Sequence, residues 1–244
     1  MQEPTPPDDE ASTTNPRKRS PLQSSMYLIT AATPFEMDAY LQAAGQSSST
    51  RQLITGIGPV EAAVRTTVFL ADIDIPIRGV INIGVAGAYL HEVQGPRVLD
   101  ICLADREILG DFGICSAEAV EPLRGEALDI VDTFSLENDL LFAAEVQLAA
   151  LGIAYQRGSF ITVSCVSGSR QRGDLLGLQY QALCENMEGA AVARACLQFG
   201  LPLLELRCIS NLVEDRDLQQ WQLKEACRRC GVVAAVLVEG LPND

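Results

Sequence analysis

Two glutamates in this sequence could carry out chemistry on a bound ligand. Glu36 follows the first apolar run of the chain, and Glu188 precedes the small residues Gly189 to Ala191, which leave room for a ligand to approach. A carboxylate at such a place can activate a water molecule, or orient a sugar and stabilise a developing positive charge. Each could instead be an ordinary acid in the first turn of a helix. Glu185 is interpreted as structural.

Strands and helices must alternate along the chain to position these acids. Apolar runs predict strands at 26–32, 51–56, 78–87, 97–108, 159–168, 182–187 and 202–210. Periodic apolar patterns predict helices at roughly 34–44, 58–72, 137–151, 188–199 and 219–239. The alternation predicts an α/β fold, a three-layer sandwich with a central mixed, twisted sheet covered by helices. Ligands of such sheets sit at the carboxyl ends of the strands, where Glu36, Glu188 and Asn211 fall.

Composition separates a tail from one domain and excludes several classes of partner. Residues 1–25 are rich in Pro, Ser, Thr and charge, which predicts a disordered N-terminal tail before a single domain at 26–244. The net charge of −14 argues against nucleic acid and against an anionic membrane surface. No apolar stretch reaches the roughly 18 residues of a membrane helix. We therefore expect a cytoplasmic protein that binds neither nucleic acid nor membrane.

The eight cysteines do not form a recognisable metal or redox motif. The pair in "CRRC" at 227–230 has no partner pair, and the chain contains one histidine, so the ligand spacings of a zinc site are missing. No metal site is predicted. Four cysteines lie in apolar, strand-like runs and are expected to behave as small buried hydrophobes: Cys102, Cys165, Cys184 and Cys208.

Two glycine-rich turns first suggest a phosphate site, "TGIGPVEAAV" at 55–64 and "NIGVAGAY" at 82–89. Neither matches a dinucleotide or P-loop pattern, and Pro59 removes a backbone N–H where an anion would need one. Each turn alone is equally well explained as a tight connection.

Taken together, four motifs resemble the nucleoside phosphorylase and nucleosidase superfamily: "TGIG-x-x-x-A", "INIGVAG", "ENMEGAAVA" and "ISN", in that order. The chain resembles its nucleosidase branch, which includes the methylthioadenosine/adenosylhomocysteine nucleosidases. "TAATPFE" at 30–36 and "ISNLVEDRDLQQW" at 209–221 are most similar to the futalosine hydrolases. The resemblance covers about residues 26–240 and implies a nucleoside phosphorylase-like fold. It further implies a homo-oligomer without metal or organic cofactor that hydrolyses futalosine to hypoxanthine and dehypoxanthinyl futalosine, a step of menaquinone synthesis.

The resemblance also implies roles for individual residues. Glu36 corresponds to the glutamate that activates water, Glu188 to the one that binds the ribose hydroxyls, and Met187 to the methionine that packs on the sugar. At "NIGVAG", Gly84 and Val85 are expected to line the site. Val85 stands where relatives carry the serine or threonine that holds phosphate, which favours hydrolysis over phosphorolysis.

The dipeptide Ser210–Asn211 departs from the methylthioadenosine branch, where an aspartate follows the serine. An asparagine cannot deliver a proton, but its amide has both a donor and an acceptor. The donor can reach O6 of a 6-oxopurine while the oxygen accepts from N7–H, so Asn211 favours hypoxanthine over adenine. As an alternative, Asn211 could be a cap or turn residue.

Two further segments are expected to shape the pocket. Ser164, Cys165 and Val166 fall where the family's base-contacting strand lies, and their backbone groups could touch the purine. Arg216 and Trp221 could bind the aromatic carboxylate on the 5′ side of futalosine, or could simply belong to a surface loop.

Three rival functions are weighed against futalosine hydrolysis. They are a methylthioadenosine/adenosylhomocysteine nucleosidase, a 6-oxopurine nucleoside phosphorylase and a non-catalytic nucleoside-binding module. A binding module would not need Glu36 beside Glu188, so the presence of both glutamates argues against it.

Overall fold

The computed structural model describes residues 25–45, 49–90, 95–116, 119–123, 125, 128–214 and 217–242. The strands are β1 (Met26–Ala31), β2 (Thr50–Ile54), β3 (Ile77–Ala88), β4 (Ile101–Leu109), β5 (Ile114–Cys115), β6 (Val120–Glu121), β7 (Thr133–Ser135), β8 (Tyr155–Thr162), β9 (Ala182–Asn186) and β10 (Leu203–Leu212). The helices are α1 (Pro34–Ala44), α2 (Pro59–Asp72), α3 (Asp139–Ala150), α4 (Arg170–Tyr180), α5 (Gly189–Phe199) and α6 (Leu223–Gly240), with a 3₁₀ turn at Leu218–Gln220.

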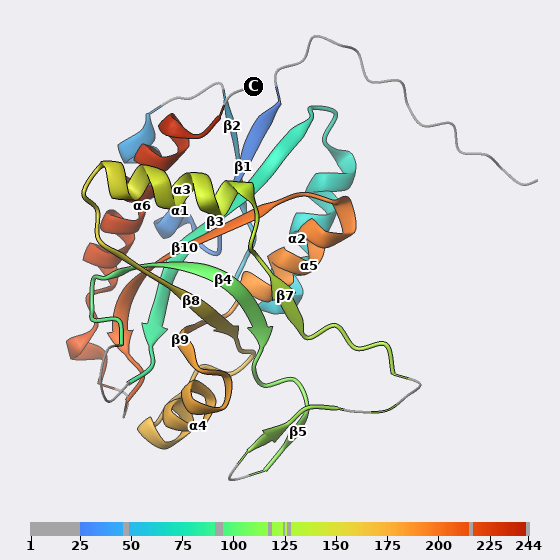
Figure 1. Ribbon diagram of the computed structural model, residues 1–244, viewed down its shortest axis with the longest axis vertical. Helices are drawn as coiled ribbons and strands as arrows, with labels where there is room; N and C mark the ends of the chain where they lie inside the picture. Colours follow the sequence, from blue (N-terminus) through green and yellow to red (C-terminus); the bar gives the residue numbers. More distant parts are fainter. Residues whose placement is uncertain are drawn as a thin grey trace, which may run out of the picture.

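A mixed sheet forms the centre of the molecule, with strand order β10-β4-β8-β9-β3-β1-β2 (Figure 1). Strand β10 pairs with β3 as well as with β4. The strands β3, β10, β4, β8 and β9 therefore close into a ring, and β1 and β2 extend it on one side. Closure of the ring brings the carboxyl ends of β3 and β9 together, and the candidate functional site lies near these ends.

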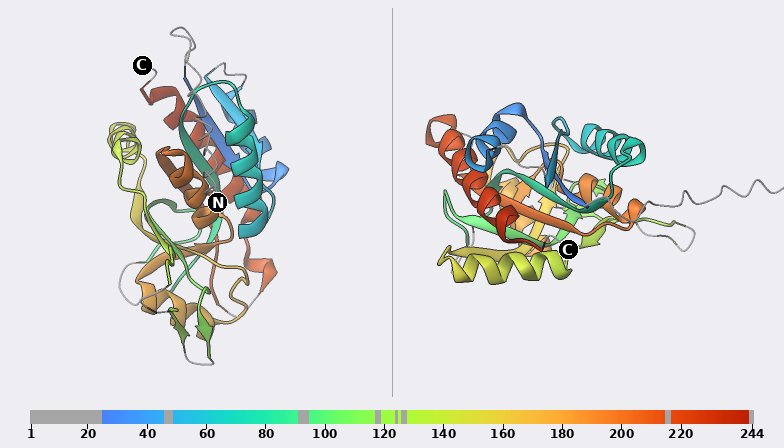
Figure 2. Two further views of the ribbon diagram at one scale, coloured as in Figure 1. Left: turned by 90° about the vertical axis from the view of Figure 1, so that its right-hand side faces the viewer. Right: turned by 90° about the horizontal axis from the view of Figure 1, so that it is seen from above.

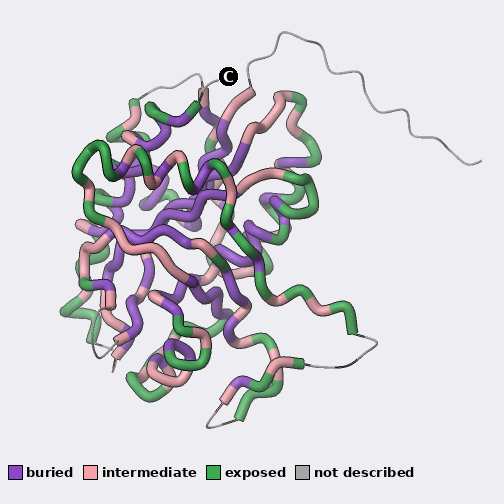
Figure 3. Tube along the Cα trace, viewed as in Figure 1, coloured by how far each residue is buried: buried purple, intermediate pink, exposed green. Residues whose placement is uncertain are grey.

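Helices cover both faces of this sheet (Figure 2). Helices α1, α3 and α6 pack around one apolar cluster, and α2 and α5 pack around a second one on the other face. The strands are mostly buried, whereas the outer faces of the helices and the segment around β5 and β6 are exposed (Figure 3). The predicted α/β fold with a mixed sheet between helices is confirmed.

Each predicted strand and helix is present, but several boundaries were wrong. Strand β4 begins at Ile101 rather than at 97, and α6 begins at Leu223 after the 3₁₀ turn. Strand β8 begins earlier than predicted and ends at Thr162, so residues 163–168 form a loop. Helix α4 and the short strands β5, β6 and β7 were not predicted.

The cysteine predictions hold for three of the four residues named above. Cys102, Cys184 and Cys208 are buried, whereas Cys165 is exposed because it lies in the loop after β8. In the described part of the chain, no group of three or more acids, cysteines and histidines is arranged to hold a metal ion.

The N-terminal boundary can be described from Ser25 onward. Its hydroxyl accepts hydrogen bonds from Nε and Nη2 of Arg78, at 3.0 and 2.7 Å, so Ser25 is attached to β3. The rest of the predicted tail, residues 1–24, lies outside the described residues. Among the described helices, none has the length and apolar character that crossing a membrane requires.

Candidate functional site

Glu36 connects the start of α1 to the carboxyl end of β3. Its Oε2 accepts hydrogen bonds from the backbone N–H and the hydroxyl of Thr33, at 3.0 and 2.8 Å, which forms a capping box with Pro34 in the first turn. Its Oε1 accepts from the N–H of Val85 at 3.1 Å. The carboxylate is therefore both a helix cap and a fixed acceptor beside the "NIGVAG" segment, and only 8% of the residue is exposed. This segment lies within β3, so the prediction of a turn there was wrong.

Glu188 precedes α5 but does not cap it. The side chain of Asn186 takes that role, because its Oδ1 accepts from the N–H groups of Glu188 and Gly189 at 2.9 and 2.7 Å. The Glu188 carboxylate accepts instead from the N–H of Gly58 at 2.9 Å, across from the start of α2. The alternative of a simple first-turn acid therefore does not describe Glu188.

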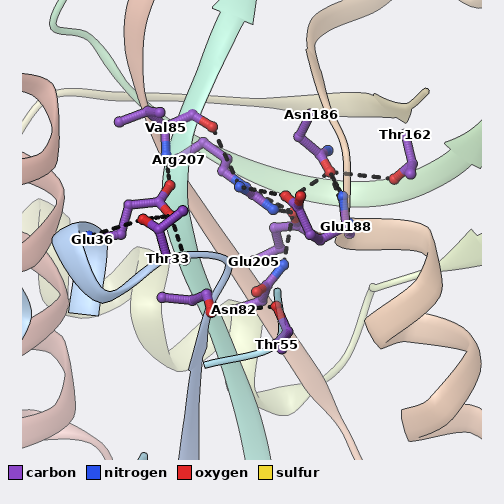
Figure 4. A network of polar contacts seen from close by, with 12 residues as sticks. Thr33, Glu36, Thr55, Asn82, Val85, Thr162, Asn186, Glu188, Glu205 and Arg207 are labelled. Carbon is purple, nitrogen blue, oxygen red and sulfur yellow. Dashed lines mark hydrogen bonds and ion pairs between the residues drawn. The ribbon is translucent and has the colours of Figure 1, made fainter. Parts of the chain in front are cut away.

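A buried arginine that the sequence analysis missed lies between these acids (Figure 4). Arg207 Nη2 pairs with Glu205 Oε1 at 2.8 Å, and its Nη1 lies 3.7 Å from Glu188 Oε2 and 3.3 Å from the carbonyl oxygen of Val85. Burial lowers the pKa of Arg207, but the charges of Glu205 and Glu188 raise it more, so its pKa lies above the ordinary value. Arg207 is a permanent cation in this site.

Gly84 leaves the space in which Glu36 and Arg207 meet. A Cβ at this position would lie 2.6 Å from Glu36 Oε1 and 2.7 Å from Arg207 Nη1, closer than non-bonded atoms approach. The structure thus brings Glu36, Glu188 and Arg207 together near the carboxyl end of β3. Burial raises the pKa of Glu188, and the charge of Arg207 and the Gly58 N–H offset part of that rise.

Buried polar side chains from β4, β8 and β9 support the start of α5. Glu107 is fully buried and accepts from the Thr162 hydroxyl at 2.8 Å and from Asn186 Nδ2 at 2.6 Å. The Thr162 oxygen in turn accepts from the N–H of Ala190 at 2.7 Å. Burial raises the pKa of Glu107 well above the ordinary carboxyl value, and the charge of Glu205 raises it further. Both effects favour the protonated, neutral form of Glu107.

Asn211 ends β10 beside a separate part of the site. Its Oδ1 accepts from the Ser210 hydroxyl at 2.7 Å, and its Nδ2 donates to the carbonyl oxygen of Leu212 at 3.1 Å. Asn211 lines a small cavity with Ser167 and Trp221. The structure thus places Trp221 beside Asn211 in the lining of this cavity, whereas Arg216 lies outside the described residues.

The loop after β8 is built differently from the predicted base-contacting strand. The N–H groups of Ser164 and Cys165 both donate to the carboxylate of Asp111, at distances of 2.9 to 3.1 Å. These two donors are therefore already bound. Val166 is 40% exposed, and it is the unpredicted Ser167 that reaches the cavity beside Asn211.

Met187, the residue predicted to pack on the sugar, is half-buried between Asn186 and Glu188, at the edge of the carboxylate site. Arg65 of α2 faces solvent, because its side chain is 54% exposed and pairs with Glu61 one turn earlier.

The arrangement is suited to a ligand that carries hydroxyl groups and develops positive charge. Glu36 and Glu188 supply two buried carboxylates from opposite sides of a cation, and a carboxylate so placed can accept from a hydroxyl or take a proton from water. The amide of Asn211 can donate and accept toward a planar heterocycle in the cavity that Asn211 lines.

Comparisons with known proteins agree with this chemistry. Residues 29–241 match the family model of the phosphorylase superfamily. The futalosine hydrolase of Thermus thermophilus is 33% identical over 174 residues, which cover 71% of this chain and 74% of that protein. The futalosine hydrolase of Streptomyces coelicolor is 31% identical over 200 residues, covering 79% and 81%. The 5′-methylthioadenosine/S-adenosylhomocysteine nucleosidase of Helicobacter pylori shares the fold, with a TM-score of 0.77 at 19% identity over 90% of this chain and 100% of that one.

Proposed function

Because the chain belongs to the futalosine hydrolase family within the phosphorylase superfamily, we propose that it hydrolyses the N-ribosidic bond of futalosine. The products are hypoxanthine and dehypoxanthinyl futalosine, and we place the reaction in cytoplasmic menaquinone synthesis. Membership of this family makes the chain an N-glycosyl hydrolase of the purine nucleosidase type. The observation that carries the proposal is the convergence of Glu36, Glu188 and Arg207 at Gly84.

Glu188 is proposed to bind the ribose hydroxyls. Cleavage of the bond between C1′ and the base passes through a sugar with oxocarbenium character, and a nearby carboxylate stabilises the positive charge as it develops. Met187 lies directly beside Glu188 and is half-buried, so it can pack on the sugar. Arg207 Nη1 lies 3.7 Å from Glu188 Oε2. Its positive charge offsets part of the rise in the pKa of Glu188 that burial causes.

Glu36 is proposed to take the proton from the attacking water. Its two oxygens are fixed by Thr33 and by the N–H of Val85, so the carboxylate is oriented before a substrate binds. A general base of this kind typically contributes about 10²–10⁴-fold to the rate. Arg207 is a positioning residue for this step because its Nη1 and Glu36 Oε1 share the space beside Gly84.

Asn211 is proposed to bind the departing base. The Ser210 hydroxyl donates to Oδ1, which fixes the orientation of the amide in the cavity. In that orientation Nδ2 can donate to O6 of hypoxanthine, and Oδ1 retains a lone pair for N7–H. Asn211 supplies no proton itself, so its contribution is to stabilise the leaving base by hydrogen bonding.

Water is favoured over phosphate because one backbone N–H in each glycine-rich segment is already bound to a carboxylate. Glu188 accepts from the N–H of Gly58, and Glu36 accepts from the N–H of Val85. Pro59 has no N–H to offer. A phosphate at either of these N–H groups would have to displace a carboxylate and lie beside its negative charge, which supports hydrolysis.

A comparison of four nucleosides tests the proposal. The purified protein is incubated with futalosine, its 6-amino analogue, inosine and methylthioadenosine, and release of the free base is followed with and without phosphate. We expect futalosine to be cleaved with the highest kcat/KM and at a rate independent of phosphate. Preference for methylthioadenosine or for the 6-amino analogue would contradict the proposed substrate.

We further propose that the enzyme is a homo-oligomer that associates through α2. Val60, Val64 and Val68 form an apolar stripe along this helix and are 74%, 56% and 53% exposed. An exposed row of this kind is typical of a subunit interface. Light scattering should give a mass of at least two chains for the wild type and a single chain for Val64→Lys, and a monomeric wild type would contradict the assembly.

A further inference from the structure

Glu205 binds one edge of the Arg207 guanidinium group, and the remaining nitrogen of that group faces the site (Figure 4). Nε and Nη2 both donate to Glu205 Oε1, at 3.0 and 2.8 Å. Nη1 donates to the carbonyl oxygen of Val85 at 3.3 Å and lies 3.7 Å from Glu188 Oε2. Because the guanidinium group is planar and rigid, two bonds along one edge fix the direction of Nη1.

A hydrogen-bonded chain from two further strands holds the same oxygen of Glu205. Asn82 of β3 donates from Nδ2 to Glu205 Oε1 at 3.2 Å, and the hydroxyl of Thr30 in β1 donates to Asn82 Oδ1 at 2.9 Å. The contact with Thr30 orients the amide so that its N–H₂ group faces the carboxylate. Glu205 is fully buried, and its second oxygen has no hydrogen-bond partner among the described residues. The contacts of this carboxylate therefore converge on the oxygen that binds Arg207.

Among the buried acids around Arg207, Glu205 is the one that holds it. Glu188 is farther away, at 3.7 Å, and Glu36 and Glu107 make their hydrogen bonds to other groups. Burial lowers the pKa of Arg207, and of the charges that raise it Glu205 acts most, ahead of Glu188. The position of this cation therefore depends on Glu205 more than on the two glutamates that are proposed to face the substrate.

We propose that Glu205 is a positioning residue for the hydrolysis, which acts by directing Nη1 of Arg207 to the place where Glu36 and Glu188 meet the substrate. This inference rests on the proposed function of the site. Glu205 is fully buried, so it acts through Arg207 and not on the substrate. Without the bonds along one edge, the guanidinium group can rotate, and Nη1 then leaves its place beside Glu36 Oε1 at Gly84. Loss of Glu205 should therefore lower turnover only as long as Arg207 is present.

A double-mutant cycle separates positioning through Arg207 from a general effect on the fold. The variants are Glu205→Gln, Arg207→Ala and the two combined, and kcat and KM are measured with the nucleoside that the wild type cleaves fastest. Glutamine keeps the shape of the side chain and one oxygen but loses the charge that binds the guanidinium group. Glu145→Gln is the matched control, because Glu145 of α3 pairs at 3.1 Å with a different arginine, Arg157, near the start of β8 and away from the site.

The effect of Glu205→Gln in the two backgrounds is the result that decides. We expect it to lower kcat by about tenfold or more when Arg207 is present, since small displacements of oriented groups have effects of this size. In the Arg207→Ala background it should change kcat by less than about twofold, because no guanidinium group is left to direct. Glu145→Gln should leave kcat and KM within about twofold of the wild type. An equal loss in both backgrounds, a wild-type kcat in folded Glu205→Gln, or an equally large loss in Glu145→Gln would overturn the inference.

Rescue by a free guanidinium compound gives a second test that does not require Glu205→Gln to fold on its own. Ethylguanidinium is added to Arg207→Ala and to the double variant, in which no buried charge of the pair is left unpaired. With Glu205 present, the added ion should be held along the same edge and raise kcat by about threefold or more, whereas kcat of the double variant should not respond. Equal rescue of both variants, or rescue of neither, would overturn the role of Glu205.

The kinetic results also separate this inference from the proposed function. A wild type that cleaves none of the four nucleosides, or that cleaves them only when phosphate is present, would overturn the proposed function. A cycle in which the two substitutions act independently, in an enzyme that hydrolyses one of these nucleosides, would overturn this inference alone.

Discussion

Replacing Glu107 with glutamine should make the stability of the protein less dependent on pH. Glu107 is fully buried, and burial followed by the charge of Glu205 raises its pKa well above the ordinary carboxyl value. Above that ordinary value the unfolded chain releases the proton while the folded chain keeps it, so the free energy of unfolding falls as pH rises. For one group the loss is about 1.4 kcal/mol per pH unit until the folded-state pKa is reached. Glutamine is neutral and similar in shape, and it removes this loss.

Urea unfolding of both proteins near pH 5, 6 and 7 measures the effect. The difference in free energy of unfolding, Glu107→Gln minus wild type, should become more positive by about 1.4 kcal/mol for each unit by which the pH rises. Thr162→Val is the matched control, because it removes a donor to the same carboxyl and leaves that carboxyl in place. Its cost should be about 1–3 kcal/mol at each pH. Parallel pH curves for Glu107→Gln and the wild type would refute a neutral Glu107.

Three further predictions concern the carboxylates, the glycine between them and the N-terminal segment. Glu188→Gln should raise KM and lower kcat in steady-state kinetics, whereas Glu36→Gln should mainly lower kcat, by about 10²–10⁴-fold; near wild-type turnover of folded Glu36→Gln would exclude water activation. Gly84→Ala should lower kcat at least about tenfold, because the added Cβ displaces Glu36 and Arg207; unchanged kcat would show that the two need not meet there. Deletion of residues 1–24 should leave kcat/KM and Tm nearly unchanged, and a large loss of either would show that the segment packs on the domain.

The sequence was sufficient to find the two glutamates because both follow strands at sites with local signals. Glu36 lies three residues after Thr33 and two after Pro34, a pattern that starts a helix. Glu188 precedes the small residues of α5. The alternation of strands and helices likewise identified the elements of the sheet, since each pattern depends only on neighbouring residues.

Arg207 and Glu205 were missed because they lie inside an apolar run. In "LLELR" the two charged residues are two positions apart, so a strand places them on the same face. This spacing permits a salt bridge that is buried within the sheet. The spacing was therefore the signal by which the pair could have been found in the sequence. Glu107, whose pKa is affected by the charges of both residues, comes from β4, and that proximity depends on closure of the ring.

The remaining errors arise from contacts between distant segments. Helix α4 contains two glycines and many polar residues, and Gly173 and Gly177 are needed because Val213 and Tyr89 pack closely against them. The segment 163–168 has the composition of a strand, but Asp111 binds its N–H groups and ends β8 early. The residues within either segment do not indicate which distant residues will contact it.

Hydrolysis in ¹⁸O-labelled water with excess phosphate present tests the central claim most directly. Glu36 is proposed to activate water, and one backbone N–H in each glycine-rich segment is bound to a carboxylate. With futalosine as substrate, the label should therefore appear on C1′ of the released sugar, in amounts equal to the hypoxanthine formed and independent of phosphate. An unlabelled sugar 1-phosphate that increases with added phosphate would contradict the account.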